Sequence, residues 1–338
     1  MHLTCSIILA AGKGTRLKSS LPKVMHEILG YPLIYYSLAL VQDISETMIV
    51  VVGHGREMVM EYLKNFTVTP VIQEPQLGTG HAILMAQPAL DETNAHDALI
   101  LPADMPLIRK ESLMGLMKSY HESNADLGVL TARAVNPHGY GRIVRNKNGK
   151  IKRIVEHIDA TEKEQKIDEI NTGVYVINKE FLLTAVERIC PDNAKGEFYL
   201  TDVVSMTSKI VSYTVTDPDE AHGINSRAQL AFAQAHMQER INKYHMEAGV
   251  TFMDPQTAWI SPEAHIEQDV EVWPDVHILG TSRIEAGVKI MPNVWIKDSA
   301  IGALSTIGFG SIIEGTHVNQ GSSIAPNTRL PEAMVVPD

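Results

Sequence analysis

The stretch that decides the fold is Ser6–Arg16, which reads SIILAAGKGTR and joins a short apolar run to a glycine-rich loop. Glycine lets backbone N–H groups approach phosphate oxygens closely, and successive amides in such a loop form an anion-binding hollow. No acidic residue occurs before Glu27, although the whole chain has a net charge of −11. The basic residues of this opening stretch are Lys13, Arg16, Lys18 and Lys23. We therefore expect an anion site here, with a purely structural turn as the alternative.

The loop matches neither of two common phosphate motifs. The Walker A pattern GxxxxGK[ST] is missing, and Leu17 occupies the third glycine position of the Rossmann fingerprint. A local basic loop is nevertheless enough to bind a phosphorylated small substrate. The acidic balance of the chain, with 29 Lys and Arg against 40 Asp and Glu, argues against a general binder of nucleic acid or of anionic membranes.

Around this loop, the first two-thirds of the chain alternate strand-like and helical patterns. The strand-like runs are Ser6–Ala10, Met48–Val52, Pro70–Gln73, Ala98–Pro102 and Asp126–Ala134. The amphipathic helical candidates are Leu21–Val41, Arg56–Lys64, Gly80–Leu90 and Lys110–Ser123. Nearly continuous apolar strands that alternate with helices predict an α/β fold with a doubly wound, mostly parallel sheet covered on both faces. Ligands of such sheets bind beyond the carboxyl ends of the strands, which again points to the first loop.

From about Gly139 the pattern changes to shorter elements that we expect to complete the sheet and to form one wall of a cleft. The expected strands are Arg142–Arg145, Ile151–Glu156, Glu169–Ile177 and Ile210–Thr216. The expected helices are Phe181–Ile189 and Thr201–Lys209. The periodicity of Ser226–Ala248 predicts one long helix, in which an apolar stripe is formed by Leu230, Met237, Ile241, Tyr244 and Ala248.

The last segment has a six-residue period. Its aliphatic residues are Ile260, Ile266, Val272, Ile278, Ile284, Ile290 and Ile296, followed after a five-residue step by Ile301, Ile307 and Ile313. Such a period is typical of a left-handed parallel β-helix, in which each side of a triangular coil contributes one inward aliphatic side chain. We expect three parts: a catalytic domain over 1–225, a linker helix over 226–249 and a short β-helix over 250–338.

The expected compartment follows from the cysteines and the first residues. Cys5 and Cys190 are too few for a disulfide framework and suit a reducing environment. Residues 1–12 form an apolar run too short to cross a bilayer and have no basic leader. We therefore expect a cytoplasmic protein without a membrane partner.

A series of motifs in order along the chain gives a more specific indication. They are Leu9–Arg16 (LAAGKGTR) with Leu21–Lys23 (LPK), Gln73–His81 (QEPQLGTGH), Gly139–Ile143 (GYGRI), Val155–His157 (VEH), Asn171–Gly173 (NTG), Glu197–Asp202 (EFYLTD) and Gly223–Arg227 (GINSR). The series resembles the bacterial bifunctional N-acetylglucosamine-1-phosphate uridylyltransferase / glucosamine-1-phosphate acetyltransferase family over nearly the whole chain. The resemblance implies the nucleotide-diphospho-sugar transferase (Rossmann-like) fold and the reaction of UTP with N-acetylglucosamine 1-phosphate, a step toward cell-wall precursors.

The resemblance also implies roles for individual residues on the nucleotide side. Arg16 and Lys23 stabilise the phosphates. The remaining residues expected to line or recognise the nucleotide are Leu9, Ala10, Ala11, Gly12, Gln73, Gly78, Thr79 and Ala103, with Gln73, Gly78 and Thr79 at the uracil edge. The alternative for Gln73 is a surface loop residue.

For the metal and the sugar, the resemblance implies two further groups. Asp104 and Asn225 bind Mg²⁺, whose preference for oxygen ligands they suit. The sugar contacts are Gly141, Glu156, Asn171, Tyr199 and Thr201. Without the resemblance, Asp104 could cap a turn, Glu156 could be a strand-edge carboxylate, and the Asn171 segment could be an ordinary turn.

Three departures from the family pattern leave alternatives open. Pro102 and Ala103 stand before Asp104, where the family usually has glycine, and LPADMPLI also resembles the cytidylyltransferases of cofactor synthesis. Ser226 stands where a second Asn is common. The chain ends at Asp338 without the family's acetyltransferase motifs, so we expect no acetyltransferase activity. The alternatives are another sugar-1-phosphate nucleotidyltransferase, using glucose 1-phosphate or dTTP, and a non-catalytic sugar-nucleotide scaffold.

The resemblance further implies a homotrimer formed through the β-helix. Two roles are open for the tryptophans of this segment, the trimer contact and packing against the neighbouring domain; they are Trp259, Trp273 and Trp295. An acyltransferase built on the repeats is disfavoured, because His265, His277 and His317 match no catalytic motif.

Overall fold

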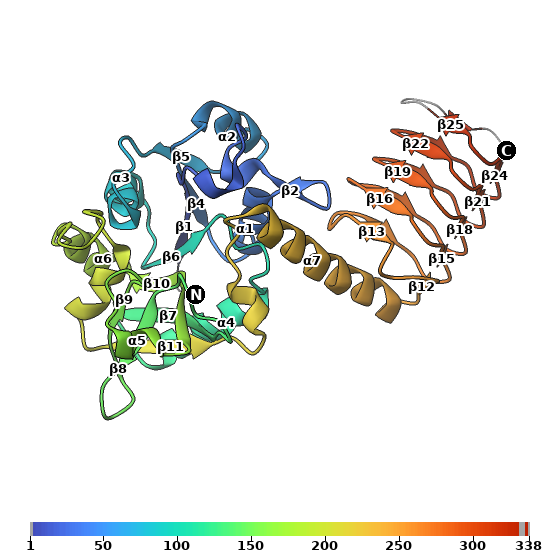
Figure 1. Cartoon of the computed structure of the whole chain (residues 1–338). Helices are drawn as coiled ribbons and strands as arrows, with labels where there is room; N and C mark the ends of the chain where they lie inside the picture. Colours follow the sequence, from blue (N-terminus) through green and yellow to red (C-terminus); the bar gives the residue numbers. More distant parts are fainter. Residues whose placement is uncertain (1–2, 331–334, 337–338) are drawn as a thin grey trace. The chain divides into compact units, whose positions relative to one another are not determined.

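The computed structural model describes residues 3–330 and 335–336. The chain divides into two compact units, which are treated separately below. Unit 1 takes in the chain through His26 together with Pro32–Gln229, and unit 2 takes in Glu27–Tyr31 and the chain from Leu230 onward. Figure 1 labels the elements of both units.

Unit 1 is built on one sheet, to which nine strands of the described residues contribute (Figure 1). The order is β11-β7-β10-β6-β1-β4-β5, with the β8–β9 pair joined at β10. Only β10 runs antiparallel to its neighbours β6 and β7 along this path, so the prediction of a mostly parallel α/β sheet is confirmed. The strands are β1 (Thr4–Ala10), β4 (Thr47–Val52), β5 (Thr69–Ile72), β6 (Asp97–Pro102), β7 (Leu127–Arg133), β8 (Arg142–Arg145), β9 (Ile151–Val155), β10 (Glu169–Asn178) and β11 (Ile210–Thr214).

Helices cover both faces of this sheet because successive strand residues point to opposite sides. Ile7 of β1 packs in a buried cluster with residues of α3 (Thr79–Asp91) and α6 (Lys179–Val186). Ile8, the next residue, packs with α1 (Leu33–Val41), α2 (Arg56–Leu63) and α4 (Lys110–Glu122). Burying each such aliphatic side chain contributes roughly 1.5–3 kcal/mol. The short elements of unit 1 are α5 (Glu162–Gln165) and the 3₁₀ turns η1 (Thr15–Leu17), η2 (Lys23–Met25), η3 (Leu200–Met206) and η4 (Pro218–Ala221).

Two helix predictions were wrong in part. The range Leu21–Val41 is helical only from Leu33, because η2 is followed by the two-stranded pair β2 (Glu27–Ile28) and β3 (Tyr31–Pro32). Leu29 and Gly30 form the turn between them with φ of 49° and 86°, the left-handed values that a tight hairpin needs. The helix expected over Thr201–Lys209 is the 3₁₀ turn η3.

Unit 2 contains most of α7 (Arg227–Glu247), and the apolar stripe predicted for this helix is not its buried face. Tyr244 of that stripe is 68% exposed. The buried face carries polar side chains instead. Gln238 Nε2 donates to the carbonyls of Gln256 and Ala258, at 2.9 and 2.8 Å. Asn242 Nδ2 donates to the carbonyls of Pro255 and Ala258, at 2.8 and 2.9 Å.

The rest of the described part of unit 2 forms three parallel sheets whose strands follow one another in rotation. Trp259 pairs with His277 and His277 with Trp295, so the chain returns to the same sheet after 18 residues there. All ten aliphatic residues of the six-residue period lie in one buried core. The strands are β12 (Thr251–Phe252), β13 (Trp259–Ile260), β14 (His265–Ile266), β15 (Glu271–Val272), β16 (His277–Leu279), β17 (Arg283–Ile284), β18 (Lys289–Ile290), β19 (Trp295–Lys297), β20 (Ala300–Ile301), β21 (Thr306–Ile307), β22 (Ile312–Glu314), β23 (His317–Val318), β24 (Ser323–Ile324), β25 (Arg329–Leu330) and β26 (Val335–Val336).

None of the helices in the described part of the chain combines the length and the apolar character that a membrane span requires.

Candidate active site

The glycine-rich loop leaves the carboxyl end of β1 and turns sharply. Ala10 and Ala11 are buried, whereas Gly12 and Arg16 are exposed on the loop. Gly14 has φ of 60°, and a Cβ on it would lie 2.6 Å from Cβ of Lys23. The stem of Lys23 therefore packs directly on the loop, which places its ammonium group near the end of the strand.

Three polar side chains from distant segments meet at this point. The Lys23 ammonium contacts the carboxylate of Asp104, and their side chains are 11% and 20% exposed. The same ammonium donates to Asn225 Oδ1 at 2.8 Å. The backbone links the two acceptor segments, since Ile224 N–H donates to the Asp104 carbonyl at 2.9 Å. The structure thus brings together one residue expected to bind phosphate and both residues expected to bind metal.

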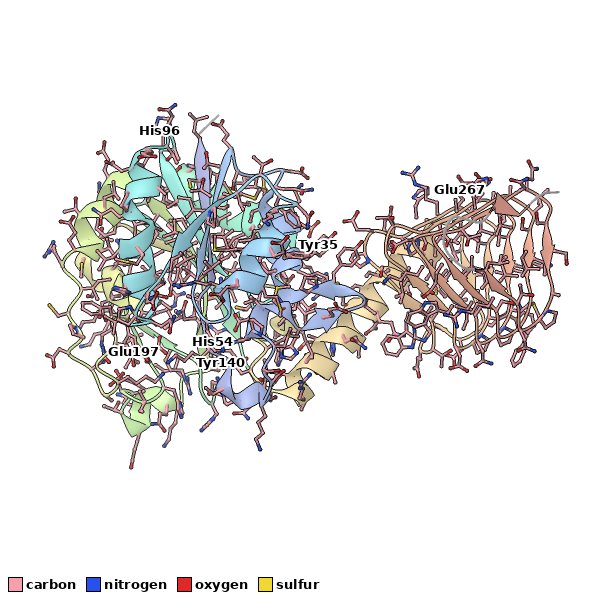
Figure 2. The ribbon with its side chains drawn as sticks, turned by 90° about the horizontal axis from the view of Figure 1, so that it is seen from above. Tyr35, His54, His96, Tyr140, Glu197 and Glu267 are labelled. Atoms are coloured by element: carbon pink, nitrogen blue, oxygen red, sulfur yellow. The ribbon has the colours of Figure 1, made fainter. Side chains whose placement is uncertain are left out.

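Next to these groups lies a pocket of about 250 Å³ within unit 1. Seven of the residues predicted for the site line it: Leu9, Thr79, Asp104, Gly141, Glu156, Asn171 and Thr201. Lining residues that the sequence analysis did not single out include Tyr140, Thr172 and Tyr175. Tyr140, which is labelled in Figure 2, lies in the quoted GYGRI motif, so a signal for it existed.

The sugar-side residues converge because of the register of three strands. Asn171 N–H donates to the Gly141 carbonyl at 2.9 Å, and Asn171 Nδ2 donates to the Tyr175 hydroxyl at 2.7 Å. A Cβ on Gly141 would lie only 3.2 Å from Glu156 Oε1. Burial raises the pKa of Glu156, against the opposing charge of Lys195. The pocket therefore offers an amide and a desolvated carboxyl group side by side, a suitable pair for sugar hydroxyls.

The predicted uracil segment is held against the motif that contains Tyr199. Gln73 is buried, and its Nε2 donates to the Gly78 carbonyl at 2.8 Å. Gly78 has φ of 113°, and a Cβ there would lie 2.5 Å from the Phe198 carbonyl oxygen. Leu200 N–H donates to Thr79 Oγ1 at 3.0 Å. Gln73 is thus fixed in a buried position rather than on a surface loop, and it is not among the residues that line the 250 Å³ pocket.

Tyr199 lines a second pocket, of about 260 Å³, which shares Glu156 and Thr201 with the first. Its hydroxyl is buried and has no hydrogen-bond partner among the described residues. Burial, together with the surrounding carboxylates, raises the pKa of Tyr199 to about 12. The five expected sugar contacts therefore lie around two adjoining pockets.

Ala103 occupies the position where the family usually has glycine. Its side chain is wholly buried in the core and its N–H donates to the Leu9 carbonyl at 3.0 Å. Its methyl group is not among the atoms that line the 250 Å³ pocket. The extra carbon therefore lies beneath the site, and Ala103 supports the end of β1 rather than facing the pocket.

The donor set of Asp104 and Asn225 fits a hard divalent cation. Their side-chain oxygens contact one common atom, Lys23 Nζ, so they converge on one small region. The described residues contain no cluster of three or more His, Cys, Asp or Glu side chains arranged to hold a metal ion. Two protein oxygens completed by water and phosphate oxygens are the usual environment of Mg²⁺.

Comparison with known proteins identifies the family of the chain. A model of the family described as nucleotidyl transferase matches residues 5–276. The bifunctional protein GlmU of Halalkalibacterium halodurans is 38% identical over 338 residues, covering 98% of this chain and 74% of that protein. The bifunctional protein GlmU of Streptococcus thermophilus is 40% identical and that of Streptococcus gordonii 41%, covering 98% and 96% of this chain and 72% and 71% of theirs.

The fold and the matched model define the class of the protein: the chain belongs to the nucleotidyl transferase family and is a nucleotidyltransferase. Within that class it belongs with the bifunctional GlmU proteins, so the resemblance predicted from the sequence is confirmed. The chain is accordingly a sugar-1-phosphate nucleotidyltransferase.

Proposed function

We propose that the protein joins UTP and N-acetylglucosamine 1-phosphate to give UDP-N-acetylglucosamine and pyrophosphate. The observation that carries the proposal is the meeting of Lys23, Asp104 and Asn225 beside the pocket that contains Glu156 and Asn171. This meeting supports the proposal, because a cation and two oxygen donors suited to a metal ion lie beside groups that suit a sugar.

This reaction requires neutralisation of negative charge more than it requires proton transfer. A phosphate oxygen of the sugar phosphate attacks the α-phosphorus of UTP. A new P–O bond forms there, the bond to the bridging α–β oxygen breaks, and pyrophosphate leaves with that electron pair. The attacking phosphate is already a dianion near neutral pH, so no general base is required. Catalysis therefore rests on in-line positioning and on stabilising the negative charge.

Each part of the site has a proposed role in this reaction. The loop amides at Gly12, with the charges of Arg16 and Lys23, bind the phosphates. The uracil edge is bound by Gln73, Gly78 and Thr79. The side-chain nitrogen of Gln73 already donates to the Gly78 carbonyl, so the side-chain oxygen of Gln73 is the atom left to bind the base. The sugar lies against Gly141, Glu156, Asn171, Tyr199 and Thr201.

Asp104 and Asn225 would hold Mg²⁺, which would supply Lewis-acid stabilisation of the phosphate charge when bound. Lys23 contacts both of these residues, so its ammonium group adds a fixed positive charge at the same point. The desolvation of this point strengthens each of these interactions.

The test is pyrophosphate release measured for UTP, dTTP, CTP and GTP, each against N-acetylglucosamine 1-phosphate, glucosamine 1-phosphate and glucose 1-phosphate. We expect the highest kcat/KM for UTP with N-acetylglucosamine 1-phosphate. A clear preference for another pair would identify a different sugar-1-phosphate nucleotidyltransferase. Zero release from every pair would leave a non-catalytic sugar-nucleotide scaffold.

For unit 2 we propose a left-handed parallel β-helix that assembles a homotrimer. Three parallel sheets with buried aliphatics at every rung support the helix. Trp259, His277 and Trp295 stack along one sheet, with ring centroids 6.3 and 5.0 Å apart, and offer an aromatic surface for the contact. Light scattering at micromolar concentration should give three times the chain mass, and a monomer would contradict the proposal.

The expected lack of acetyl transfer stays a prediction, to be checked with acetyl-CoA and glucosamine 1-phosphate.

A further inference from the structure

Arg142 lies at the junction of the three strands that carry the sugar side of the pocket. It begins β8 and pairs in register with Val155 of β9 and with Ile170 of β10. Glu156 directly follows Val155, and Asn171 directly follows Ile170. Gly141 directly precedes Arg142 itself. Each strand at this junction therefore carries one pocket residue directly beside the paired position.

The side chain of Arg142 is an unusual one to bury. It is only 1% exposed, and in the described part of the structure it forms no ion pair with a carboxylate. Its Nε–H is also buried without a hydrogen-bond partner among the described residues. Burial lowers the pKa of Arg142, against the opposing charge of Glu156. Burying a cation without a direct ion pair lowers stability, and an apolar side chain of similar volume would serve folding better.

Two of the hydrogen bonds of Arg142 go to residues that adjoin the sugar-side residues of the pocket in sequence. Its guanidinium contacts the Tyr140 carbonyl and donates to His157 Nδ1 at 3.2 Å. A longer contact, at 3.5 Å, reaches the Gln165 carbonyl. Burial, together with His138 and Arg142, lowers the pKa of His157, so the ring stays neutral and can accept. Tyr140 precedes Gly141, and His157 follows Glu156.

We propose that Arg142 is a positioning residue for sugar binding, which fixes Gly141 and Glu156 relative to each other by holding the Tyr140 carbonyl and the His157 ring. Gly141 and Glu156 lie close together, since a Cβ on Gly141 would lie 3.2 Å from Glu156 Oε1. A shift of either segment changes the width of the sugar pocket while the nucleotide loop, which lies on β1, keeps its place. The inference rests on the proposed function, because it assigns the pocket to the sugar.

The test separates the two substrates kinetically. Arg142→Met removes the charge and the hydrogen bonds at similar volume, and we expect the KM for the sugar 1-phosphate to rise roughly tenfold or more, because displacements of about 1 Å have effects of this size. The KM for UTP should stay within about twofold, because the nucleotide contacts are unchanged. Arg142→Lys keeps the charge and can make one of the two bonds, so it should restore part of the loss.

Two further variants keep the test decisive if Arg142→Met does not fold. His157 is half-buried, and His157→Ala removes one acceptor of Arg142. We expect the KM for the sugar 1-phosphate to rise about threefold. His157→Gln supplies another acceptor and should reduce this rise. The matched control is Arg145→Met on the same strand, which removes the 2.6 Å ion pair with Glu169 away from the pocket. It should lower the melting temperature without changing the sugar KM.

An equal rise of both KM values in Arg142→Lys and His157→Ala, or a fall in melting temperature with no change in the sugar KM, would overturn the inference. Failure of the proposed function is distinguishable from either result, because the wild-type protein would then release no pyrophosphate or would prefer another pair of substrates.

Discussion

The Cβ of Lys23 occupies the space that a side chain on Gly14 would need, since a Cβ built on Gly14 lies 2.6 Å from it. The conformation of Gly14, with φ of 60°, also disfavours any other residue. Glycine at this position thus serves the placement of a lysine nine residues later in the chain. The glycine-rich loop and the cation of the site form one structural arrangement.

Gly14→Ala should therefore lower kcat by moving Lys23. Lys23 must shift away from the new methyl group, and a displacement of this kind lowers rates by tenfold to roughly a hundredfold. Steady-state pyrophosphate release would measure the effect. The matched control is Gly149→Ala in the β8–β9 turn, where φ is 75° but a Cβ meets nothing within 4 Å. That variant should lose roughly 1 kcal/mol of stability from the backbone strain alone and keep its kcat. Equal kcat losses in both variants would refute the argument.

Lys23→Ala should lower kcat strongly. The ammonium group faces Asp104 and Asn225 where charge accumulates, and removing one such group typically lowers kcat by about 10²–10³-fold. The control is Lys64→Ala directly after α2, whose exposed ammonium pairs with Glu61 on the surface. A kcat for Lys23→Ala within twofold of wild type would remove Lys23 from the reaction.

Asp104→Asn should raise the Mg²⁺ concentration needed for half-maximal activity, by about tenfold or more, because a carboxylate ligand is replaced by a neutral amide. Titration of activity with MgCl₂ at saturating substrates measures this. Asp43→Asn, which changes an exposed carboxylate that pairs with Lys110, is the matched control and should leave the metal dependence unchanged. An unchanged requirement in Asp104→Asn would exclude Asp104 as a metal ligand.

His245 should make unit 2 less stable as the pH falls. Burial, and then the charge of His265, lower the pKa of His245 from 6.5 to about 4. Between pH 6.5 and about 4, His245 is therefore protonated in the unfolded chain and neutral in the folded chain. The stability contribution is complete above pH 6.5 and decreases as the pH falls toward 4, by roughly 3 kcal/mol.

His245→Leu should remove this part of the pH dependence. Denaturant unfolding of both proteins at pH 7 and pH 4.5 would measure it, followed by tryptophan fluorescence, because the three tryptophans of the chain, Trp259, Trp273 and Trp295, all lie in unit 2. The expected outcome is a smaller loss of unfolding free energy in the variant. Parallel losses in both proteins would show that His245 titrates at its ordinary value.

The sequence predicted the sheet of unit 1 well because each strand is a local signal. Runs such as Met48–Val52 are apolar on both faces and end within a residue or two of the observed strands. The Leu21–Val41 helix failed because apolar spacing cannot reveal the turn at Leu29 and Gly30, whose left-handed backbone interrupts the pattern. In α7 the same method chose the wrong face. Buried amides there satisfy the carbonyl groups of residues 255, 256 and 258, a need that arises only from tertiary packing.

The site residues also differ in how far the sequence alone could predict them. The basic glycine-rich loop could be identified from residue types alone, whereas Glu156 and Asn171 were identified only through the family resemblance. Their proximity depends on the register of β8 with β9 and β10, which no local pattern encodes. Arg142 lies in the GYGRI motif, but its role is not evident from the sequence, since a buried arginine cannot be distinguished there from an exposed one.

The lysine at the centre of the site contacts partners 81 and 202 residues further along the chain. No fragment that lacks one of these segments retains the full set of contacts, so the complete arrangement exists only when unit 1 has folded as a whole. Substrate binding is then coupled thermodynamically to global folding, and we expect a saturating nucleotide to protect even remote strands from proteolysis.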